Sequence, residues 1–323
     1  MNAEELKAAL QPFYDNANEL GVTLYAILKD PNNLTPRKID ISGDALNDLK
    51  SFFLQSLRNN ISNKEDLTVL NISTSDERLD AVYVYDLEHP AELATMEAVV
   101  NTDDLPLLDL TDSALSDIKA ILIEIGNDIG QVVLYKTMAP VNIFGRAGLF
   151  LKKAQHRMER IDEEFLRVSA NFQLLRINGE LLVIDLTAIE KSFGFHEIIT
   201  REAAVGVASI EAIELVENPE TLRELLNDIK YARRFTKVAR ASPVMQAQVT
   251  NLNIIAFCKT FPLLAGRIRF NDAEDKIVLD TKVSKDLFIK LMMDDFLTSE
   301  LTSYHYESVA KDKAEIEAAS EQT

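Results

Sequence analysis

Two apolar runs around an Asn-Gly pair constrain the fold of this chain more than any other feature. The runs are FQLLRI and LLVIDL, and Asn178 and Gly179 lie between them. Both central residues of a type I′ turn need a positive φ, and Asn-Gly adopts this turn readily. The sequence therefore predicts a β-hairpin within residues 165–195, followed by a short helix from about Thr187 to Phe193.

Length and composition point to a globular protein with a sizeable core. The chain has 323 residues, of which 47% are hydrophobic, so we expect one large or two medium domains. It has no run of about 18 uncharged apolar residues, and its acidic N-terminus has no apolar stretch typical of a secretory signal. The single cysteine, Cys258, excludes a structural disulfide within the chain and fits a reducing cytosol. Because it lies in the apolar run NIIAFC, we expect a buried, inert thiol.

Charge is distributed unevenly along a chain whose formal net charge is −18. Residues 1–130 carry 9 basic and 24 acidic side chains, whereas residues 220–269 carry 9 basic and 3 acidic side chains. The segments 131–219 and 270–323 have net charges of −2 and −7. The total argues against a protein coated in basic surface, but one basic stretch inside the acidic chain is compatible with a local basic groove.

Apolar periodicity predicts an α+β fold with two domains, mixed sheets with hairpins, and several helices. We expect an acidic N-terminal α+β domain over residues 1–155, a C-terminal domain with a basic helix over 156–313, and a frayed tail over 314–323. In the first domain the expected helices are 4–20, 40–60 and 112–125, and the expected strands are 22–29, 67–73, 80–87 and 131–140.

The expected elements of the second half are mostly helices. Helices are predicted at 194–216, at 219–242, from Pro243 onward, and at 284–297, where Ser284 is the expected N-cap. Residues 266–270 and 276–280 are predicted to form a second hairpin.

The helix expected over 219–242 presents a row of cations on one side. At 100° per residue, six basic side chains fall within an arc of about 120°. These residues, called the cation row below, are Arg223, Lys230, Arg233, Arg234, Lys237 and Arg240. Such a row gains affinity for a polyanion through counterion release, and Tyr231 and Phe235 are available for stacking. Alternatively, the row pairs with the acidic residues 1–130, and composition does not choose between the two.

A second basic cluster lies in the expected connector, residues 145–165. Its members are Arg146, Lys152, Lys153, Arg157 and Arg160. A solvated connector is the simpler interpretation of these charges. Three of them join the cation row as candidate DNA-binding residues: Lys152, Lys153 and Arg157.

Catalytic motifs are absent from the sequence. It contains no GxxxxGK[ST], GxGxxG, HExxH or GxSxG, and its four histidines, at 89, 156, 196 and 305, lie far apart. One cysteine excludes a Cys-rich zinc site. The acid pairs 103–104 and 294–295 leave a carboxylate-only metal site open, although solvated loop acids are the simpler explanation. We therefore expect no enzyme activity, no catalytic residue, no cofactor and no metal.

Three segments from about residue 160 to 313 resemble a known family. They are RIDEEFLRVSANFQLLRINGELLVIDLTAIEKSFGFHE, the helix ending in KVARAS, and YHYESVAKDK. The chain resembles the KwaB family of the bacterial Kiwa anti-phage system. The resemblance implies a cytoplasmic protein that is recruited to the inner membrane by its membrane partner KwaA, binds phage DNA and blocks phage propagation. It implies no catalytic residues.

Three functions remain open at this point. A DNA-binding anti-phage effector is favoured by the resemblance, because such a protein needs a positive surface. An interaction subunit without DNA binding would dock its basic helix on the acidic domain or on KwaA. A metal-dependent nuclease would use clustered carboxylates. A homodimer is the expected assembly, since two-fold dimers are the commonest oligomers.

Overall fold

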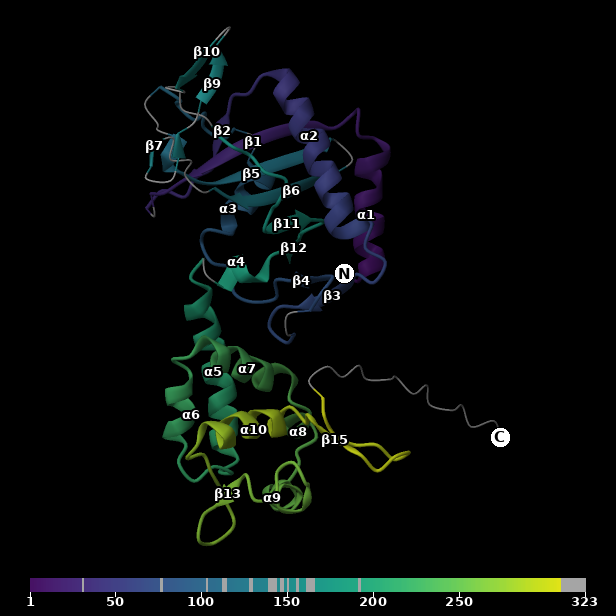
Figure 1. Cartoon of the computed structure of the whole chain (residues 1–323), viewed down its shortest axis with the longest axis vertical. Coiled ribbons are helices and arrows are strands. Elements are labelled where there is room, and N and C mark those ends of the chain that lie inside the picture. Colours follow the sequence, from purple (N-terminus) through teal and green to yellow (C-terminus); the bar gives the residue numbers. More distant parts are fainter. Residues whose placement is uncertain are drawn as a thin grey trace, which may run out of the picture. The chain divides into compact units, whose positions relative to one another are not determined.

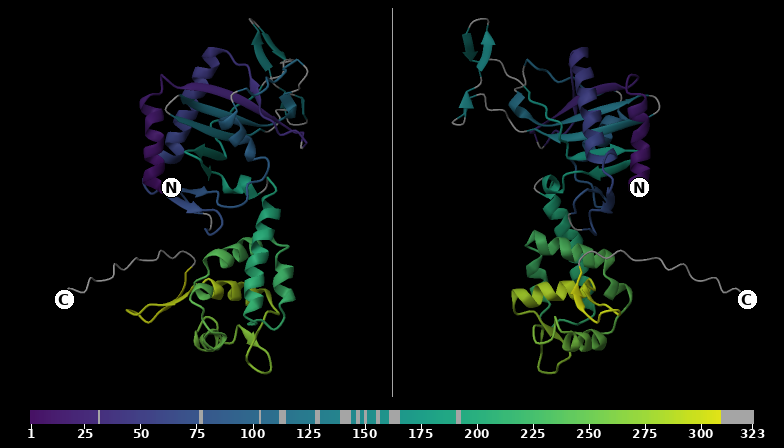
Figure 2. Two further views of the ribbon diagram at one scale, coloured as in Figure 1. Left: turned by 180° about the vertical axis from the view of Figure 1, so that it is seen from behind. Right: turned by 45° about the vertical axis from the view of Figure 1, so that its right-hand side comes forward.

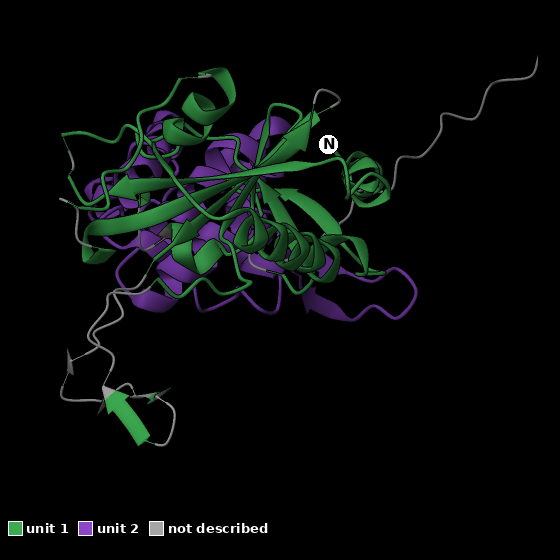
Figure 3. Cartoon of the chain, turned by 90° about the horizontal axis from the view of Figure 1, so that it is seen from above, with its two compact units in different colours: residues 1–195 green, residues 196–323 purple. Residues whose placement is uncertain are grey.

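The chain folds into two compact units, residues 1–195 (unit 1) and residues 196–323 (unit 2) (Figure 3). The computed structural model describes residues 1–308 apart from 31, 76–77, 103, 112–114, 128–129, 139–143, 146–147, 150, 155–156, 161–165 and 191–192. Helices and a large mixed sheet confirm the α+β class (Figure 1).

An eight-stranded mixed sheet forms the centre of unit 1. Its strands are β1 (Gly21–Leu28), β2 (Arg37–Ile39), β3 (Thr68–Asn71), β4 (Ala81–Val84), β5 (Ile118–Asn127), β6 (Gly130–Thr137), β11 (Leu174–Ile177) and β12 (Glu180–Val183). They lie in the order β2-β1-β5-β6-β11-β12-β4-β3, and only β3 and β4 run parallel within this sheet. The longest strands lie at the centre, and short strands form both edges.

Helices cover the two faces of this sheet. Helices α1 (Ala3–Asp15) and α2 (Gly43–Leu57) pack on the face that contains Leu24, Ile123 and Leu134, as Figure 2 shows from two sides. Successive side chains of a strand point to opposite faces, so Tyr135 points away from them. It donates a hydrogen bond to Glu92, just before helix α3 (Ala94–Asn101). Helix α3 therefore lies over the other face.

The predicted hairpin is confirmed, and it belongs to the large sheet. Asn178 and Gly179 have φ values of 51° and 83°, the positive values that a type I′ turn requires. Strand β11 pairs with β6, and β12 pairs with β4. The short helix α4 (Leu186–Glu190) follows. Because the hairpin completes this sheet, the units divide after residue 195, whereas the expected domain boundary was after residue 155.

The helix predicted over 112–125 is wrong. A short 3-10 turn, Leu115–Asp117, leads instead into strand β5, which pairs with β1 on one side and β6 on the other. Side chains on both faces of β5 are buried, including Ile121, Leu122 and Ile123. A strand buried on both faces has a continuous apolar run, which periodicity does not distinguish from a buried helix.

The expected connector forms two small hairpins in unit 1. Strand β7 (Phe144–Gly145) pairs with β8 (Gly148–Leu149), and β9 (Leu151–Ala154) pairs with β10 (Arg157–Arg160). In sequence these strands lie between β6 and β11, two neighbouring strands of the large sheet.

Unit 2 is mostly helical. Its helices are α5 (Phe195–Ala212), which begins one residue earlier, α6 (Glu220–Leu225), α7 (Ile229–Ala241), α8 (Pro243–Gln246), α9 (Asn251–Thr260) and α10 (Lys282–Met292). Two hairpins accompany them: β13 (Arg269–Phe270) with β14 (Ile277–Val278), and β15 (Phe296–Thr298) with β16 (His305–Glu307). None of the helices that the structure describes is long and apolar enough to cross a membrane.

Three helix predictions in unit 2 need correction. The helix expected over 219–242 is two helices, because Asp228 has extended backbone angles (φ −102°, ψ 117°) between α6 and α7. The helix expected from Pro243 is likewise divided into α8 and α9. The last helix begins with Thr281 as N-cap, and Ser284 is the third helical residue of its capping box. The expected tail, 314–323, lies outside the described residues.

Candidate nucleic-acid interface

Helix α7 concentrates positive charge on a buried apolar base. Its sequence, IKYARRFTKVARA, has five basic residues and no acidic residue. The Asp228 side chain caps it by accepting a hydrogen bond from the Lys230 backbone N–H at 2.9 Å. Tyr231, Phe235 and Val238 are buried on the opposite side. The cations are therefore held by a helix whose other side belongs to the core of unit 2.

The cation row is less exposed than its helical geometry predicts. Arg223 lies on α6, separate from the other five residues on α7. Lys230 and Arg240 are exposed, Arg233 and Arg234 are half-buried, and Lys237 is only 8% exposed. The five cations of α7 thus reach solvent mainly at the two ends of the helix.

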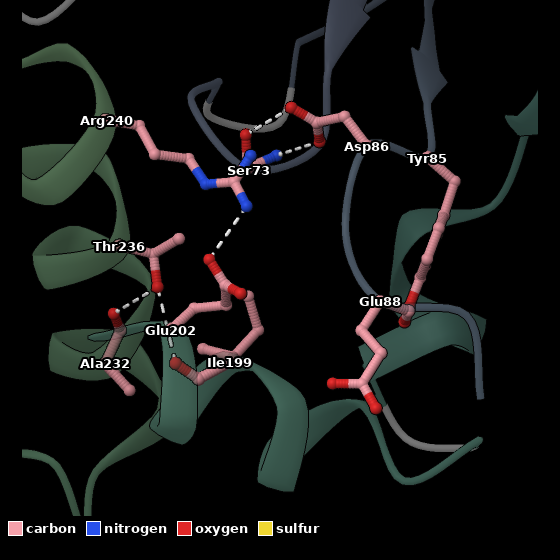
Figure 4. A network of polar contacts seen from close by, with 9 residues as sticks. All are labelled: Ser73, Tyr85, Asp86, Glu88, Ile199, Glu202, Ala232, Thr236 and Arg240. Carbon is pink, nitrogen blue, oxygen red and sulfur yellow. Dashed lines mark hydrogen bonds and ion pairs between the residues drawn. The ribbon is translucent and has the colours of Figure 1, made fainter. Parts of the chain in front are cut away.

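Three arginines of the row form ion pairs with carboxylates of unit 2. They are Arg223 with Glu211 (Nε–Oε1 and Nη2–Oε2, both 2.7 Å), Arg234 with Asp286 (Nη1–Oδ1, 3.0 Å) and Arg240 with Glu202 (Nη2–Oε2, 2.7 Å). Figure 4 shows the last pair, together with the buried Thr236 hydroxyl, which donates to the Ile199 and Ala232 carbonyl oxygens. The hydrogen bond to Glu211 raises the pKa of Arg223.

These pairs connect the helices of unit 2. Glu211 and Glu202 lie on α5, and Asp286 lies on α10, so the pairs join α6 to α5 and α7 to both α5 and α10. Ion pairs exposed to solvent contribute little to stability, because water screens the attraction between the charges. Their larger effect is to fix the arginine side chains and to reduce the positive potential of the face.

The other predicted DNA-binding residues lie in unit 1. Lys152 and Lys153 are on β9, and Arg157 is on β10. Lys153 and Arg157 are exposed, and the Arg157 guanidinium pairs with Glu159 at 2.6 Å. Glu159 is also the β-sheet partner of Lys152. The structure therefore divides the predicted residues into two groups, one in each unit.

The remaining chemical candidates do not gather into one site. His89 lies 3.6 Å from Glu97, the His305 ring packs against Phe261, and His196 is exposed at the start of α5. Asp103, Arg146 and His156 lie outside the described residues. No group of three or more His, Cys, Asp or Glu side chains able to hold a metal occurs within the described part of the chain.

Cys258 is buried, as predicted. Its side chain is 1% exposed, and burial raises the pKa of the thiol to about 12. Since the thiolate is the reactive form, this thiol is unreactive at neutral pH while unit 2 is folded.

Two buried polar clusters in unit 1 were not predicted from the sequence. The Lys136 ammonium group donates to Ser169 Oγ and to Asn171 O and Oδ1 at 2.6–2.8 Å, and burial lowers its pKa. Glu92 accepts hydrogen bonds from Tyr135 and from Lys119 (2.6 Å). In the sequence, the first cluster is signalled by the lysine that ends the apolar run VVLYK, because a charged group there needs polar partners. Both clusters are internally paired, so we assign them a structural role.

A family comparison connects this architecture to known proteins. A sequence model described as Kiwa protein KwaB-like matches residues 115–302, more than half of the chain. The chain belongs to the KwaB-like family. A KwaB-like relative, the Kiwa protein KwaB of Escherichia coli O55:H7 (strain RM12579 / EPEC), is 28% identical over 97% of this chain and 99% of its own length. No solved structure matches the chain.

The KwaB-like match includes most of the features described above. Residues 115–302 contain β5 and β6, the 178–179 hairpin, and all of helices α5 to α10. The cation row therefore lies within the part that the family shares. Membership of this family supports a role in Kiwa anti-phage defence.

Proposed function

We propose that this chain is a DNA-binding component of Kiwa anti-phage defence that acts with the membrane protein KwaA to block phage propagation. The proposed DNA contact rests on helix α7, which has five cations, no acidic residue and a buried apolar side. Lysine and arginine side chains bind phosphates and release counterions. Phosphate contacts carry no sequence information, so binding without strong sequence preference is expected.

The carboxylates beside the cation row provide a sharp test of this proposal. Glu202 and Asp286 hold Arg240 and Arg234 in place, but their negative charges oppose a phosphate at the same surface. Changing them to Gln and Asn removes the charge and keeps an oxygen that accepts the hydrogen bond. DNA affinity should then rise, if the α7 face contacts DNA.

The experiment measures DNA binding by fluorescence anisotropy. Full-length protein is titrated into a labelled duplex at salt concentrations from about 50 to 300 mM, where phosphate contacts weaken measurably. We expect the double variant Glu202→Gln/Asp286→Asn to bind about tenfold more tightly than wild type at low salt. We expect Lys230→Glu, at an exposed position, to bind more weakly and with a shallower dependence on salt.

The matched control is Asp272→Asn/Glu300→Gln, which removes two charges from exposed positions elsewhere in unit 2. Equal affinities of this control and the carboxylate double variant would show that the α7 face is not the contact surface. If wild type does not bind at the lowest salt concentration, DNA binding itself is refuted.

The partner and the assembly state belong to the same proposal. We expect the chain to copurify with KwaA from detergent-solubilised membranes, which would account for recruitment of a cytoplasmic protein to the inner membrane. We expect a homodimer by light scattering of the purified chain. Lys230→Glu should retain both properties, because the proposed DNA contact is separate from assembly.

The ion pairs favour one alternative, an interaction subunit without DNA binding. Carboxylates of unit 2 pair with three arginines of the cation row, as expected where cations have a structural role. Under this alternative, wild type does not bind DNA, and Lys230→Glu loses KwaA while remaining folded.

A further inference from the structure

Unit 1 contains an apolar groove beside helix α2. Its volume is about 500 Å³, within the range of about 300–1,000 Å³ that is usual for binding pockets. Side chains from β1, β2, α2 and β5 line it, together with apolar side chains that lie between α3 and β5 and between β10 and β11 in sequence. Representative members are Leu24, Ile39, Leu49, Phe52 and Leu110. This hollow is called the α2 groove below.

The α2 groove is surrounded by exposed apolar side chains. Among the described residues of unit 1, five large hydrophobic side chains are exposed: Phe52, Leu79, Leu107, Leu110 and Met158. Two of them, Phe52 (39% exposed) and Leu110 (50%), line the groove, and Leu107 (66%) immediately precedes another lining residue, Leu108. Apolar side chains gathered around a hollow mark a binding surface, whereas single exposed ones do not.

Carboxylates flank the groove. Asp48 lines it, and Asp44 lies one helical turn earlier on α2. Asp40 lies between the lining residues Ile39 and Ile41. Asp40, Asp44 and Asp48 are exposed.

Further charged groups of both signs lie beside lining residues of the groove in sequence. Asp109 lies between the lining residues Leu108 and Leu110, and its side chain accepts a hydrogen bond from the Thr111 N–H. Three cations lie beside lining residues in sequence: Arg37 and Lys38 precede Ile39 on β2, and the exposed Arg167 lies between Leu166 and Val168. The rim is therefore negative on the side of α2, where Asp40, Asp44 and Asp48 lie beside an apolar floor.

We propose that the α2 groove binds a cationic amphipathic helix of a partner protein. Apolar side chains spaced at i, i+3 or i+4, and i+7 would enter the groove, as in other complexes where a helix lies in an apolar groove. Lysine or arginine side chains at the edges of that helix would meet Asp44 and Asp48. Charge complementarity of this kind selects the partner and its orientation.

Charge also argues against other occupants. The negative rim repels DNA phosphates and anionic lipid headgroups, both of which need a positive surface. The most cationic described helix of the chain, α7, has its apolar side buried in unit 2, so a second folded copy does not offer the required face. The groove is thus a surface separate from the proposed DNA contact, and variants of each can be tested independently.

The test uses full-length protein and a synthetic fluorescent peptide. The peptide is an amphipathic helix of about 18 residues, long enough to form a helix, with leucines on one face and lysines beside them. A second peptide has glutamate in place of every lysine. We expect the lysine peptide to bind at least about tenfold more tightly than the glutamate peptide, with the difference decreasing at high salt.

Two groove variants and two matched controls locate the binding. Asp44→Lys/Asp48→Lys should lose at least about tenfold in affinity for the lysine peptide. Its control, Glu65→Lys/Asp66→Lys, changes the net charge by the same amount at exposed positions outside the groove, and it should keep the wild-type affinity. Leu110→Ser should weaken both peptides, whereas Leu79→Ser, at a fully exposed residue, should weaken neither. All four are changes at exposed side chains, and circular dichroism checks that each variant is folded.

Several outcomes would overturn the proposal. If the two peptides bound equally, the negative carboxylates would not select a cationic helix. If the groove variants and their controls bound the lysine peptide equally, the α2 groove would not be the binding site. Binding of wild type to anionic vesicles that Leu110→Ser abolishes would identify a lipid surface instead. Lys230→Glu should weaken DNA binding by the same factor in wild type and in each groove variant. This result would show that the α2 groove and the proposed DNA contact are independent, so that refuting one proposal leaves the other unaffected.

Discussion

Three tyrosines that lie beside carboxylates make unit 1 sensitive to alkaline pH. Burial raises the pKa of Tyr25, Tyr85 and Tyr135 above the ordinary value of 10.0, and neighbouring carboxylates raise it further. Tyr135 lies against Glu92, and Figure 4 shows Tyr85 near Glu88. These phenols therefore remain protonated in the folded protein at a pH where free tyrosine ionises.

The sign of the resulting pH dependence follows from proton counting. Above a pH of about 10, the unfolded chain releases these protons and folded unit 1 retains them, so the folded state binds more protons. The stabilisation is fully present below about pH 10, and the free energy of unfolding falls as the pH rises above it. Thermal unfolding followed by circular dichroism, from about two pH units below this value to about one unit above it, measures this fall.

Tyr135→Phe is the control for this prediction. It removes one of the three phenols, so the alkaline loss of stability should be smaller than in wild type. At neutral pH it should lower the free energy of unfolding by about 1–3 kcal/mol, because Glu92 is 7% exposed and loses a hydrogen-bond donor. An alkaline loss as large as in wild type would show that Tyr135 does not contribute.

At the scale of elements, Gly206 determines how closely α5 and α7 approach. A Cβ atom at this position would lie 2.3 Å from the Phe235 carbonyl oxygen and 3.2 Å from Ala239 Cβ. We expect Gly206→Ala to lower the free energy of unfolding of unit 2 by about 2 kcal/mol, because the two helices must move apart. The midpoint of denaturant unfolding is the measurement.

The matched substitution is Gly43→Ala, at the first residue of α2. Nothing lies within 4 Å of a Cβ atom added there. Alanine favours the helix over glycine, so the expected change is a gain of about 0.5–1 kcal/mol. If both alanine variants behaved alike, the close approach at Gly206 would have no energetic consequence.

Local signals account for the elements that were predicted correctly. The turn at Asn178 and Gly179 follows from the conformational preferences of two adjacent residues. Strand β5 was mistaken for a helix because its burial depends on β1 and β6, and no local pattern reveals those neighbours. The break between α6 and α7 at Asp228 was signalled locally, since aspartate is a preferred N-cap, but helical periodicity continued across it.

The candidate site was predictable only in part. Helical spacing placed five of the cations on one arc of α7. Their partners could not be read from the sequence, because Glu211, Glu202 and Asp286 are 12, 38 and 52 positions away from the arginines they pair with. Pairing and burial of this kind are properties of tertiary packing.

At the scale of the whole molecule, the division into two compact units predicts that each unit can unfold while the other stays folded. Cys258 is the single cysteine and is buried in unit 2, so a thiol reagent reaches it only when unit 2 opens. We expect Gly206→Ala to accelerate labelling of Cys258 at about pH 8, and Tyr135→Phe, in unit 1, to leave the labelling rate unchanged. Equal acceleration by both variants would show that the units open together.

The division into units was the hardest feature to predict. Acidic and basic composition changes along the sequence, but the sheet of unit 1 combines strands from residues 21–28 with strands as late as 180–183. Long-range strand pairing, which composition does not report, moves the boundary to residue 195.

The strand order also has a consequence for synthesis of the chain. Strand β1 pairs with β5, and Gly21 faces Gly126, so β1 leaves the ribosome about a hundred residues before its partner. Strand β4 waits similarly for β12, since Val84 faces Leu182. The apolar sides of α1 and α2 therefore have no complete sheet to cover until translation has passed the hairpin at 178–179. During that interval the nascent chain is open to chaperones and to aggregation with neighbouring nascent chains.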